Sequence, residues 1–258
     1  MTAEVLFERE GPIAVLTFNR PEARNAMTWA MYDALAATCD TVDGDDELRV
    51  LILRGAGGQA FVAGTDISQF QAFATPADAL GYERRMDQVV TRLEAVGKPT
   101  LAAIAGVAAG GGATLALACD LRYCTPESAI GVPIARTLGN CLSMANYARL
   151  VDLLGPARTK ELIFRGRLLP AEEARQAGLV TEVVAADRLE ARVREVAREI
   201  AGHAPITLRV TKEALRRLQL ARRPPECEDL IVQAYLSEDF REGVSAFLAK
   251  RRPAFRGR

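Results

Sequence analysis

The stretch VAAGGGATLALACD, residues 107–120, decides the interpretation of this chain, because three consecutive glycines lead into a helical pattern. Glycine permits unusual φ angles and lets a ligand come close to the backbone. The first turn of a helix has unpaired N–H groups and a dipole that favours negative charge. We therefore expect Gly110–Gly112 to present N–H groups to a ligand oxygen. Tight packing of a helix against a strand is the alternative explanation.

A second stretch of the same kind is Ala63–Gly64–Thr65–Asp66. One N–H group from each loop could hold an oxygen on which negative charge develops. In acyl-transfer chemistry such a donor is worth ~2.7–4 kcal/mol. The two loops together therefore predict a site that polarises a carbonyl group.

Short apolar runs alternate with helical patterns around these loops, which is typical of an α/β protein. In the segment 189–200, Leu189, Val193, Val196 and Ile200 share one helix face. We expect an α/β core over residues 1–199 and a helical C-terminal region over 200–258. Strands are expected in 4–10, 12–19, 49–55, 100–106 and 121–125, helices in 28–43 and 76–96, a Gly-rich loop over 56–70, and mainly helices after Gly139.

The bulk composition excludes several classes of protein. The 258 residues include 33 Lys and Arg and 33 Asp and Glu, so the basic excess of a nucleic-acid-binding protein is absent. No apolar run reaches the ~18 residues of a membrane span, and the first residues lack a signal pattern. We therefore expect a cytoplasmic protein without nucleic-acid or membrane partners. The five cysteines form no CxxC pair and the only histidine is His203, so neither a disulfide framework nor a metal site is expected.

The two loops occur together with FNRPEARNAM (18–27) and KPTLAAIAG (98–106), followed by HAPITLRVTKEALRR (203–217) and REGVSAFLAKRRPAF (241–255). This ordered set resembles the crotonase superfamily, the enoyl-CoA hydratase/isomerase group. The resemblance implies a crotonase-like spiral of ββα units with a helical C-terminal oligomerisation region, assembled as a homotrimer or a dimer of trimers. It also implies an acyl-CoA thioester substrate, with no cofactor beyond the coenzyme A that the substrate carries.

The resemblance also assigns roles to individual residues. It makes the N–H groups of Thr65 and Gly111 the donors of an oxyanion hole for the thioester oxygen. Coenzyme A would bind in a bent shape along two segments, and two positions of the C-terminal tail would contact its nucleotide. The coenzyme A residues implied in this way are Ala23, Arg24, Ala26, Ala63, Asp66, Ile67, Phe247 and Lys250.

Two positions depart from the pattern of typical hydratases, which carry two catalytic glutamates. Here the corresponding residues are Thr114 and Ile134, or Ala135 if the segment after Pro133 is one residue longer than usual. Each general acid or base role is worth ~10²–10⁴ in rate. We therefore expect weak or absent hydratase activity. The Thr114 hydroxyl is expected to bond back to the Gly110 carbonyl.

Few side chains could replace the missing carboxylates. Arg136 could pair with a substrate carboxylate, and Cys141 could act as a nucleophile if its pKa is depressed. Glu83 and Asp87, on the helix after the first loop, are the nearest acids. A structural or surface role is the alternative for each of them.

Three functions remain open from the sequence. The first is an enzyme that stabilises a thioester enolate, as an isomerase, a decarboxylase or another lyase. The second is a non-catalytic acyl-CoA-binding protein, and the third is an acyl-CoA thioester hydrolase.

Overall fold

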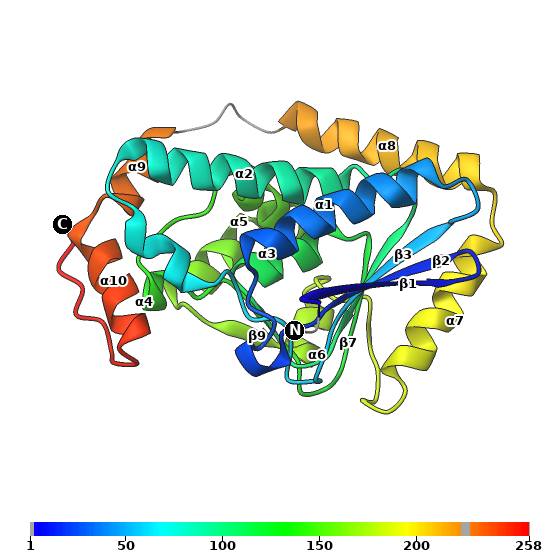
Figure 1. Cartoon of the computed structure of the whole chain (residues 1–258), viewed down its shortest axis with the longest axis horizontal. Helices are drawn as coiled ribbons and strands as arrows, with labels where there is room; N and C mark the ends of the chain where they lie inside the picture. Colours follow the sequence, from blue (N-terminus) through cyan, green and yellow to red (C-terminus); the bar gives the residue numbers. More distant parts are fainter. Residues whose placement is uncertain (1–2, 223–227, 258) are drawn as a thin grey trace.

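The computed structural model describes residues 3–222 and 228–257, and these form two sheets with helices around them (Figure 1). The strands are β1 (Val5–Glu10), β2 (Ile13–Phe18), β3 (Val50–Gly55), β4 (Ala60–Val62), β5 (Thr100–Ile104), β6 (Val107–Ala109), β7 (Leu121–Cys124), β8 (Ala129–Gly131), β9 (Leu168–Pro170) and β10 (Glu182–Val183). The helices are η1 (Pro21–Ala23), α1 (Trp29–Gly44), η2 (Ile67–Ala72), α2 (Pro76–Glu94), α3 (Gly111–Ala118), α4 (Ile134–Thr137), α5 (Met144–Phe164), α6 (Ala171–Gln176), α7 (Leu189–Ala201), α8 (Pro205–Arg222), α9 (Glu228–Tyr235) and α10 (Glu238–Leu248).

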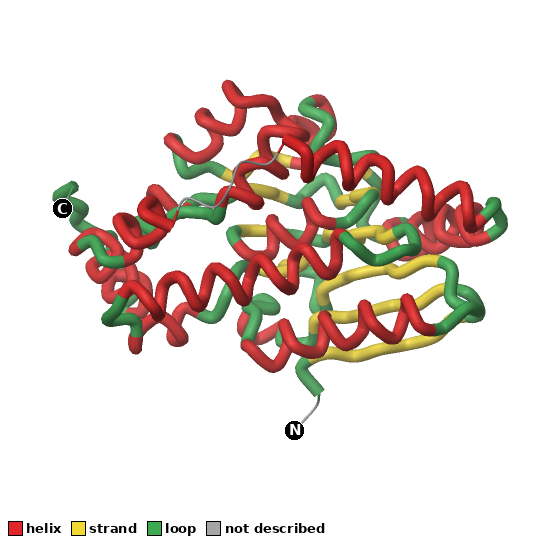
Figure 2. Tube along the Cα trace, turned by 90° about the horizontal axis from the view of Figure 1, so that it is seen from above, coloured by secondary structure: helices red, strands yellow, loops and turns green. Residues whose placement is uncertain are grey.

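From β3 to β8, consecutive strands alternate between the two sheets. The larger sheet has the order β1-β2-β3-β5-β7-β10 and the smaller one β4-β6-β8-β9. The strand pairs β3–β4, β5–β6 and β7–β8 therefore each place one strand in either sheet, and helices α2, α3 and α4 follow them. This is the expected crotonase-like spiral of ββα units with a helical C-terminal region. Seen from above, the helices cross in front of the strands (Figure 2).

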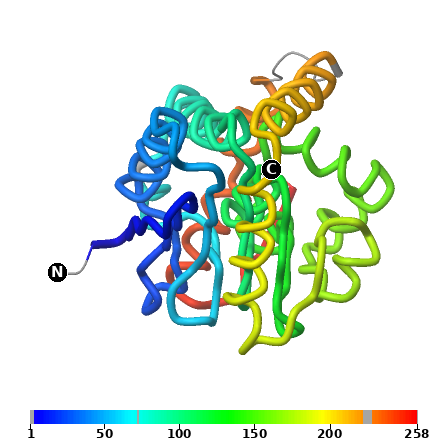
Figure 3. The backbone as a smooth tube through the Cα atoms, turned by 90° about the vertical axis from the view of Figure 1, so that its right-hand side faces the viewer, coloured from blue at the N-terminus to red at the C-terminus, as the bar shows by residue number. Residues whose placement is uncertain are grey.

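Alternating residues of the larger sheet point to opposite faces and pack into two separate hydrophobic cores. Ile13, Val15, Val50 and Ile52 face helix α7, and the residues between them face the main core. A sheet covered on both faces requires such continuous apolar runs. The expected apolar face of α7 is confirmed, because Leu189, Val193 and Val196 are buried against these strands and Ile200 is partly buried there. Figure 3 shows α7 in yellow running alongside the strands.

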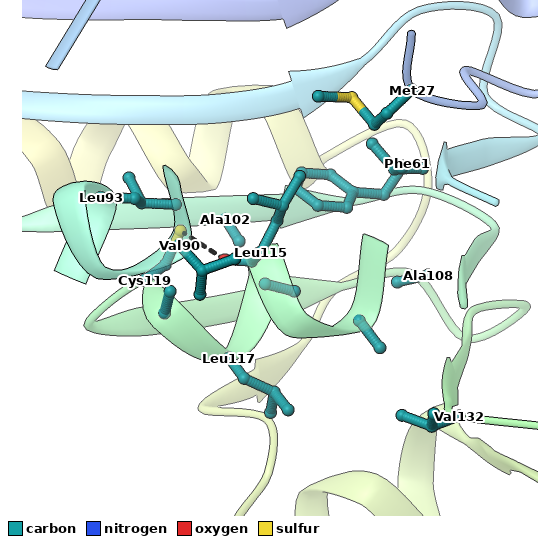
Figure 4. Packing of buried hydrophobic residues seen from close by; sticks show 14 of the residues in the cluster. Met27, Phe61, Val90, Leu93, Ala102, Ala108, Leu115, Leu117, Cys119 and Val132 are labelled. Carbon is teal, nitrogen blue, oxygen red and sulfur yellow. Dashed lines mark hydrogen bonds between the residues drawn. The ribbon is translucent and has the colours of Figure 1, made fainter. Parts of the chain in front are cut away.

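Helix α3 lies inside the main core. Every residue from Gly112 to Ala118 is buried. Figure 4 shows Phe61 beside Leu115, while Leu117 points to the opposite side of the helix, within the same buried cluster. The Cys119 thiol donates to the carbonyl of Leu115 at 3.5 Å, within the end of this helix. Gly110–Gly112 therefore lie at the start of a helix that the core holds in place.

The sequence interpretation missed five short strands. The expected loop 56–70 contains β4 and the start of η2, while β6, β8, β9 and β10 were not expected at all. Strands of two or three residues are too short for apolar alternation to appear, and they form only because a neighbouring strand is already in place. The expected strands and helices elsewhere are confirmed within a few residues.

The C-terminal helices pack at opposite ends of the molecule (Figure 1). Helix α7 lies on the larger sheet, whereas α9 contacts α2, and α10 contacts η2. The expected boundary between residues 199 and 200 falls inside α7. The division into a core and an oligomerisation region stays a prediction, and part of the second region, residues 223–227, lies outside the described residues.

Candidate active site

A cavity of about 450 Å³ opens between the two glycine loops, helix α2 and the C-terminal helices. Its walls are mostly apolar, with a few polar groups directed into it, as in most small-molecule sites. The cavity brings together residues from distant parts of the chain. Of the predicted site residues, Ala23, Arg24, Ala26, Ala63, Thr65, Asp66, Ile67, Glu83, Gly111, Thr114, Ile134, Cys141 and Phe247 line it.

Thr65 and Gly111 lie next to each other at this cavity. A Cβ atom built on Gly111 would be 3.7 Å from the Thr65 nitrogen and 3.1 Å from its hydroxyl oxygen. Neither N–H group takes part in the backbone hydrogen bonds formed among the described residues. Two unpaired donors from separate segments therefore stand side by side, and one of them belongs to the first turn of helix α3.

The backbone around both amides is held by hydrogen bonds that glycine makes possible. Gly64 has φ +127° and Gly110 has φ +53°, conformations that favour glycine. The Gly64 carbonyl accepts from the Met27 amide at 2.9 Å, and the Gly110 amide donates to the Gly131 carbonyl at 3.0 Å. Each glycine is thereby fixed to a neighbouring segment, and the following N–H is left unpaired.

The Thr65 side chain is anchored by two buried phenols. Its hydroxyl lies 2.9 Å from the hydroxyl of Tyr32 on α1 and 3.1 Å from that of Tyr82 on α2. All three residues are buried. A buried hydroxyl with two partners costs much more to move than an exposed one. This network therefore orients the Thr65 backbone.

Both the hydroxyl and the amide of Thr114 form hydrogen bonds within its own helix. It is 2% exposed, and its hydroxyl donates to the Gly111 carbonyl at 2.7 Å. The expected back-bond is therefore present, although its acceptor is Gly111 and not Gly110, whose carbonyl accepts the Thr114 amide instead. Because this hydroxyl proton is already used inside the helix, Thr114 is poorly placed to transfer protons.

The loop expected to hold coenzyme A has an unusual backbone. Arg24 and Asn25 both have positive φ angles, and the buried Asn25 amide stabilises the turn by donating to the carbonyls of Ala60 at 2.8 Å and Ala56 at 3.0 Å. An asparagine tolerates this conformation better than most residues. The turn holds Arg24 at the cavity wall.

Asp66 is held as a carboxylate by its neighbours. Burial alone would raise its pKa, but hydrogen bonds from Ser68 and the charge of Arg20 bring the pKa below its ordinary value. The carboxylate accepts from the Ser68 amide at 3.2 Å and the Ser68 hydroxyl at 2.7 Å, which caps η2. Its visible role is structural.

Two of the predicted site residues lie outside the cavity, and a third lies in it with a raised pKa. Arg136 is exposed on α4, packs its Cβ beside Gly166 and is outside the cavity lining, so it is not placed to pair with a substrate there. Lys250 is also exposed outside the lining, in contrast to Phe247. Burial raises the pKa of Cys141 to about 12, so its thiol stays protonated and is a poor nucleophile.

Glu83 is the most unusual group at the cavity. Its side chain comes from α2, it is 5% exposed, and its carboxylate accepts a hydrogen bond from the phenol of Tyr235 on α9. The Asn140 amide donates to the same phenol oxygen at 3.1 Å. Burial raises the pKa of Glu83 to about 8, although the bonds from Tyr235 and from the Ser143 backbone lower it. Ile134, by contrast, contributes an apolar wall.

Three polar residues at the site were not predicted from the sequence: Tyr32, Tyr82 and Tyr235. A sequence signal did exist for Glu83, since Ala79, Glu83, Met86 and Val90 share the buried face of α2. A glutamate on the buried face of a helix is rare, because a buried carboxylate needs a partner for its charge. Nothing in the sequence pairs Glu83 with Tyr235, which lies far along the chain.

No group of three or more histidine, cysteine, aspartate or glutamate side chains within residues 3–222 and 228–257 is placed to hold a metal ion. Cys39, Cys119, Cys124 and Cys141 are free, and Cys227 lies outside the described residues. No helix of the described chain is both long enough and apolar enough to cross a bilayer.

Comparison with known proteins identifies the group to which this architecture belongs. The family model of enoyl-CoA hydratase/isomerase matches residues 8–258. The chain belongs to the enoyl-CoA hydratase/isomerase family. Membership places it in the crotonase superfamily, a group of enzymes, and agrees with the ββα spiral described above.

The relatives carry the names of different reactions. A short-chain-enoyl-CoA hydratase of Clostridium acetobutylicum is 32% identical over 257 residues, which cover 96% of this chain and 95% of that protein. A 1,2-epoxyphenylacetyl-CoA isomerase of Escherichia coli is 36% identical, with 98% of each chain covered. A solved structure of methylmalonyl-CoA decarboxylase has a TM-score of 0.90 at 27% identity and full coverage of both chains. The family is thus clear, and the reaction depends on the residues of the site.

Proposed function

We propose that this chain binds an acyl-CoA thioester and stabilises its enolate with the N–H groups of Thr65 and Gly111. The observation that carries the proposal is the adjacency at the cavity of these two residues, whose amides form no backbone hydrogen bond among the described residues. An enolate places negative charge on the thioester oxygen, and two N–H donors in a site shielded from water stabilise that charge most effectively. Coenzyme A enters as part of the substrate, so the proposal needs no other cofactor.

The reaction we propose is isomerisation, decarboxylation or another lyase step that passes through the enolate, and not efficient hydration. Thr114 and Ile134 stand where the resemblance puts the two glutamates of hydratases. The Thr114 hydroxyl is bonded inside its helix, and Ile134 has no ionisable group. Hydration needs one group to activate water and one to protonate the α-carbon, and neither position supplies one.

Coenzyme A would lie along the turn that contains Ala23, Arg24 and Ala26 and along the segment Ala63–Ile67. These residues line the cavity, and Arg24 adds a positive charge that suits the phosphates of coenzyme A. Phe247, 52% exposed at the cavity edge, offers an apolar contact to the same molecule. Lys250 is a weaker candidate because it lies outside the lining.

We also propose a homotrimer or a dimer of trimers, with the C-terminal helices at the interface. Helix α8 exposes large apolar side chains, among them Ile206 at 66% and Val210 at 58%. An exposed apolar face of this kind usually marks a protein interface. The family resemblance points in the same direction.

The test uses purified protein with crotonyl-CoA and with a panel of saturated and unsaturated acyl-CoA thioesters. We expect slow or undetectable hydration of crotonyl-CoA and α-carbon deuterium exchange with saturated thioesters in heavy water. Rapid hydration would refute the proposed reaction. Release of free coenzyme A without exchange would identify a thioester hydrolase, and binding without any turnover would identify an acyl-CoA-binding protein.

A further inference from the structure

We propose that Glu83 is the acid–base residue of this site: its carboxylate removes a proton from the substrate carbon and returns one, and Tyr235 positions it. The inference rests on the proposed function, because the proton it moves is the one whose loss creates the enolate. Glu83 would perform the proton transfer that Thr114 and Ile134 cannot perform.

The first argument is elimination among the acids of the cavity. Within the described chain, Asp66 and Glu83 are the carboxylates that line it. Asp66 is occupied by the amide and hydroxyl of Ser68 and lies beside Arg20. These contacts hold its pKa low, so it is a weak base. Glu83 remains as the carboxylate that can accept a proton.

The second argument is the chemistry of the groups around Glu83. No lysine or arginine forms an ion pair with it among the residues that the structure describes. Its carboxylate accepts a hydrogen bond from the phenol of Tyr235, and Asn140 donates to that phenol at 3.1 Å. Because the phenol oxygen accepts from Asn140, its hydrogen is directed to Glu83. A neutral donor orients a carboxylate without neutralising its basicity, in contrast to an arginine.

The third argument is the proton affinity that this environment produces. Burial disfavours the charged form and raises the pKa of Glu83 to about 8. A general base works best when its pKa lies near the working pH, because it is then both available and strong enough. A structural carboxylate in an ion pair would have the opposite shift.

The fourth argument is a second space beside Glu83. Glu83 also borders a small cavity of about 10 Å³ with Asp87 and Ser143. The Ser143 hydroxyl donates to Asp87 at 2.6 Å. A space of this size is close to the minimum for one water molecule, and it also borders Arg84 and Glu228, whose side chains are 55% and 47% exposed. A water molecule there would let the proton on Glu83 exchange near the surface.

The step balances without a further reactant. The Glu83 carboxylate takes the α-proton, and the C–H electron pair forms the C=C bond of the enolate as the carbonyl pair moves onto the thioester oxygen. Thr65 and Gly111 hold that oxygen by their N–H groups. The carboxylic acid then returns the proton to the α-carbon or, if a β,γ double bond is present, to the γ-carbon. The second outcome converts a 3-enoyl thioester into a 2-enoyl thioester, so this is the substrate class we assign.

The experiment follows deuterium exchange into butyryl-CoA and isomerisation of 3-butenoyl-CoA by the full-length protein. Glu83→Gln should lower both rates by about 10²–10⁴, with butyryl-CoA still bound, since a general base contributes that much. The matched control is Glu94→Gln, on the same helix, whose carboxylate pairs with Arg149 at 3.0 Å outside the cavity. It should leave the rates unchanged.

Tyr235→Phe tests the positioning role. The Tyr235 hydrogen bond lowers the Glu83 pKa, so its removal should move the pH profile of exchange to higher pH and lower kcat more than it changes KM. A residue that only packs would not shift the profile.

The outcomes separate the two proposals. Absence of exchange and isomerisation in the wild type, with butyryl-CoA bound, would overturn the proposed function and this inference together. Wild-type exchange that persists in folded Glu83→Gln would overturn the role of Glu83 alone. If Glu83→Gln fails to fold, the wild-type profile decides: a rise with a midpoint near pH 8 supports the inference, and a flat profile overturns it.

Discussion

The amide nitrogen of Thr65 lies 3.7 Å from the point where a Cβ atom on Gly111 would be. The same Cβ would lie 2.8 Å from the Tyr32 hydroxyl, which bonds Thr65 in turn. Tyr32 therefore lies against both loops: its hydroxyl bonds Thr65 and stands next to Gly111. A Cβ at position 111 would therefore crowd the Tyr32 hydroxyl, and this relationship leads to the first prediction.

Gly111→Pro should abolish most of the activity, because proline removes the proposed N–H donor. Proline is tolerated sterically in the first turn of a helix, where Gly111 lies. The matched control is Gly111→Ala, which adds the same Cβ and keeps the N–H. We expect Gly111→Pro to lose about 10²–10³ more in kcat than Gly111→Ala, as measured by exchange into butyryl-CoA. Equal losses in the two variants would assign the effect to crowding and not to the donor.

Thr65→Val should destabilise the protein, because two buried phenols lose their common partner. The hydroxyls of Tyr32 and Tyr82 both bond Thr65, and a buried polar group without a partner costs about 1–3 kcal/mol. Urea denaturation would measure the change in unfolding free energy.

The control for Thr65→Val is Thr38→Val. Thr38 is also buried, at 8% exposure, but its hydroxyl only donates to the Ala34 carbonyl within α1 at 2.9 Å. Thr38→Val should lower the unfolding free energy clearly less than Thr65→Val does. A loss as large as that of Thr65→Val would contradict the anchoring role of the two phenols.

Glu83 should make the folded protein lose stability as the pH rises. Burial raises its pKa from 4.5 to about 8 in the folded state, so the folded form binds this proton more tightly than the unfolded form does. The contribution is complete below about pH 4.5 and is lost as the pH passes through 8. The titratable or charged neighbours are Tyr32, Tyr82, Arg84, Asp87, Cys141, Tyr147, Glu228 and Tyr235.

Thermal unfolding of the wild type and of Glu83→Gln checks this prediction. Glutamine cannot ionise, so the wild-type Tm should fall relative to that of the variant between about pH 5 and pH 9. A constant difference in Tm across this range would mean that the Glu83 pKa is ordinary in the folded protein.

Replacement of exposed apolar residues on α8 should disrupt the proposed assembly. Ile206 and Val210 lie one turn apart and are 66% and 58% exposed. Ile206→Glu with Val210→Glu should shift the mass in solution from about three or six times 27.9 kDa to a single chain, because two buried charges oppose association. Size-exclusion chromatography with light scattering measures this mass. A wild-type protein that is already monomeric would refute the trimer.

The sequence predicted the parts of the fold that depend on local patterns. The helix that begins at the glycines 110–112, the apolar stripe of α7 and the strands expected in 4–10 and 12–19 all appear in the structure. Each of these follows from the conformational freedom of glycine or from the periodicity of apolar side chains.

The rest depends on contacts between distant segments. The phenols on Thr65 come from α1 and α2, and the partner of Glu83 comes from α9, so no local pattern encodes them. The sequence could not show that Arg136 lies outside the cavity, for the same reason. The direction of a four-residue helix depends on how it packs against the rest of the fold. The raised Cys141 pKa likewise results from tertiary burial.

The most direct test of the central claim is a crystal structure with butyryl-CoA bound. The account predicts that the thioester oxygen lies about 2.7–3.1 Å from both the Thr65 and the Gly111 nitrogens. A thioester oxygen that contacts only one of these nitrogens, or that faces solvent with the acyl chain outside the cavity, would contradict it.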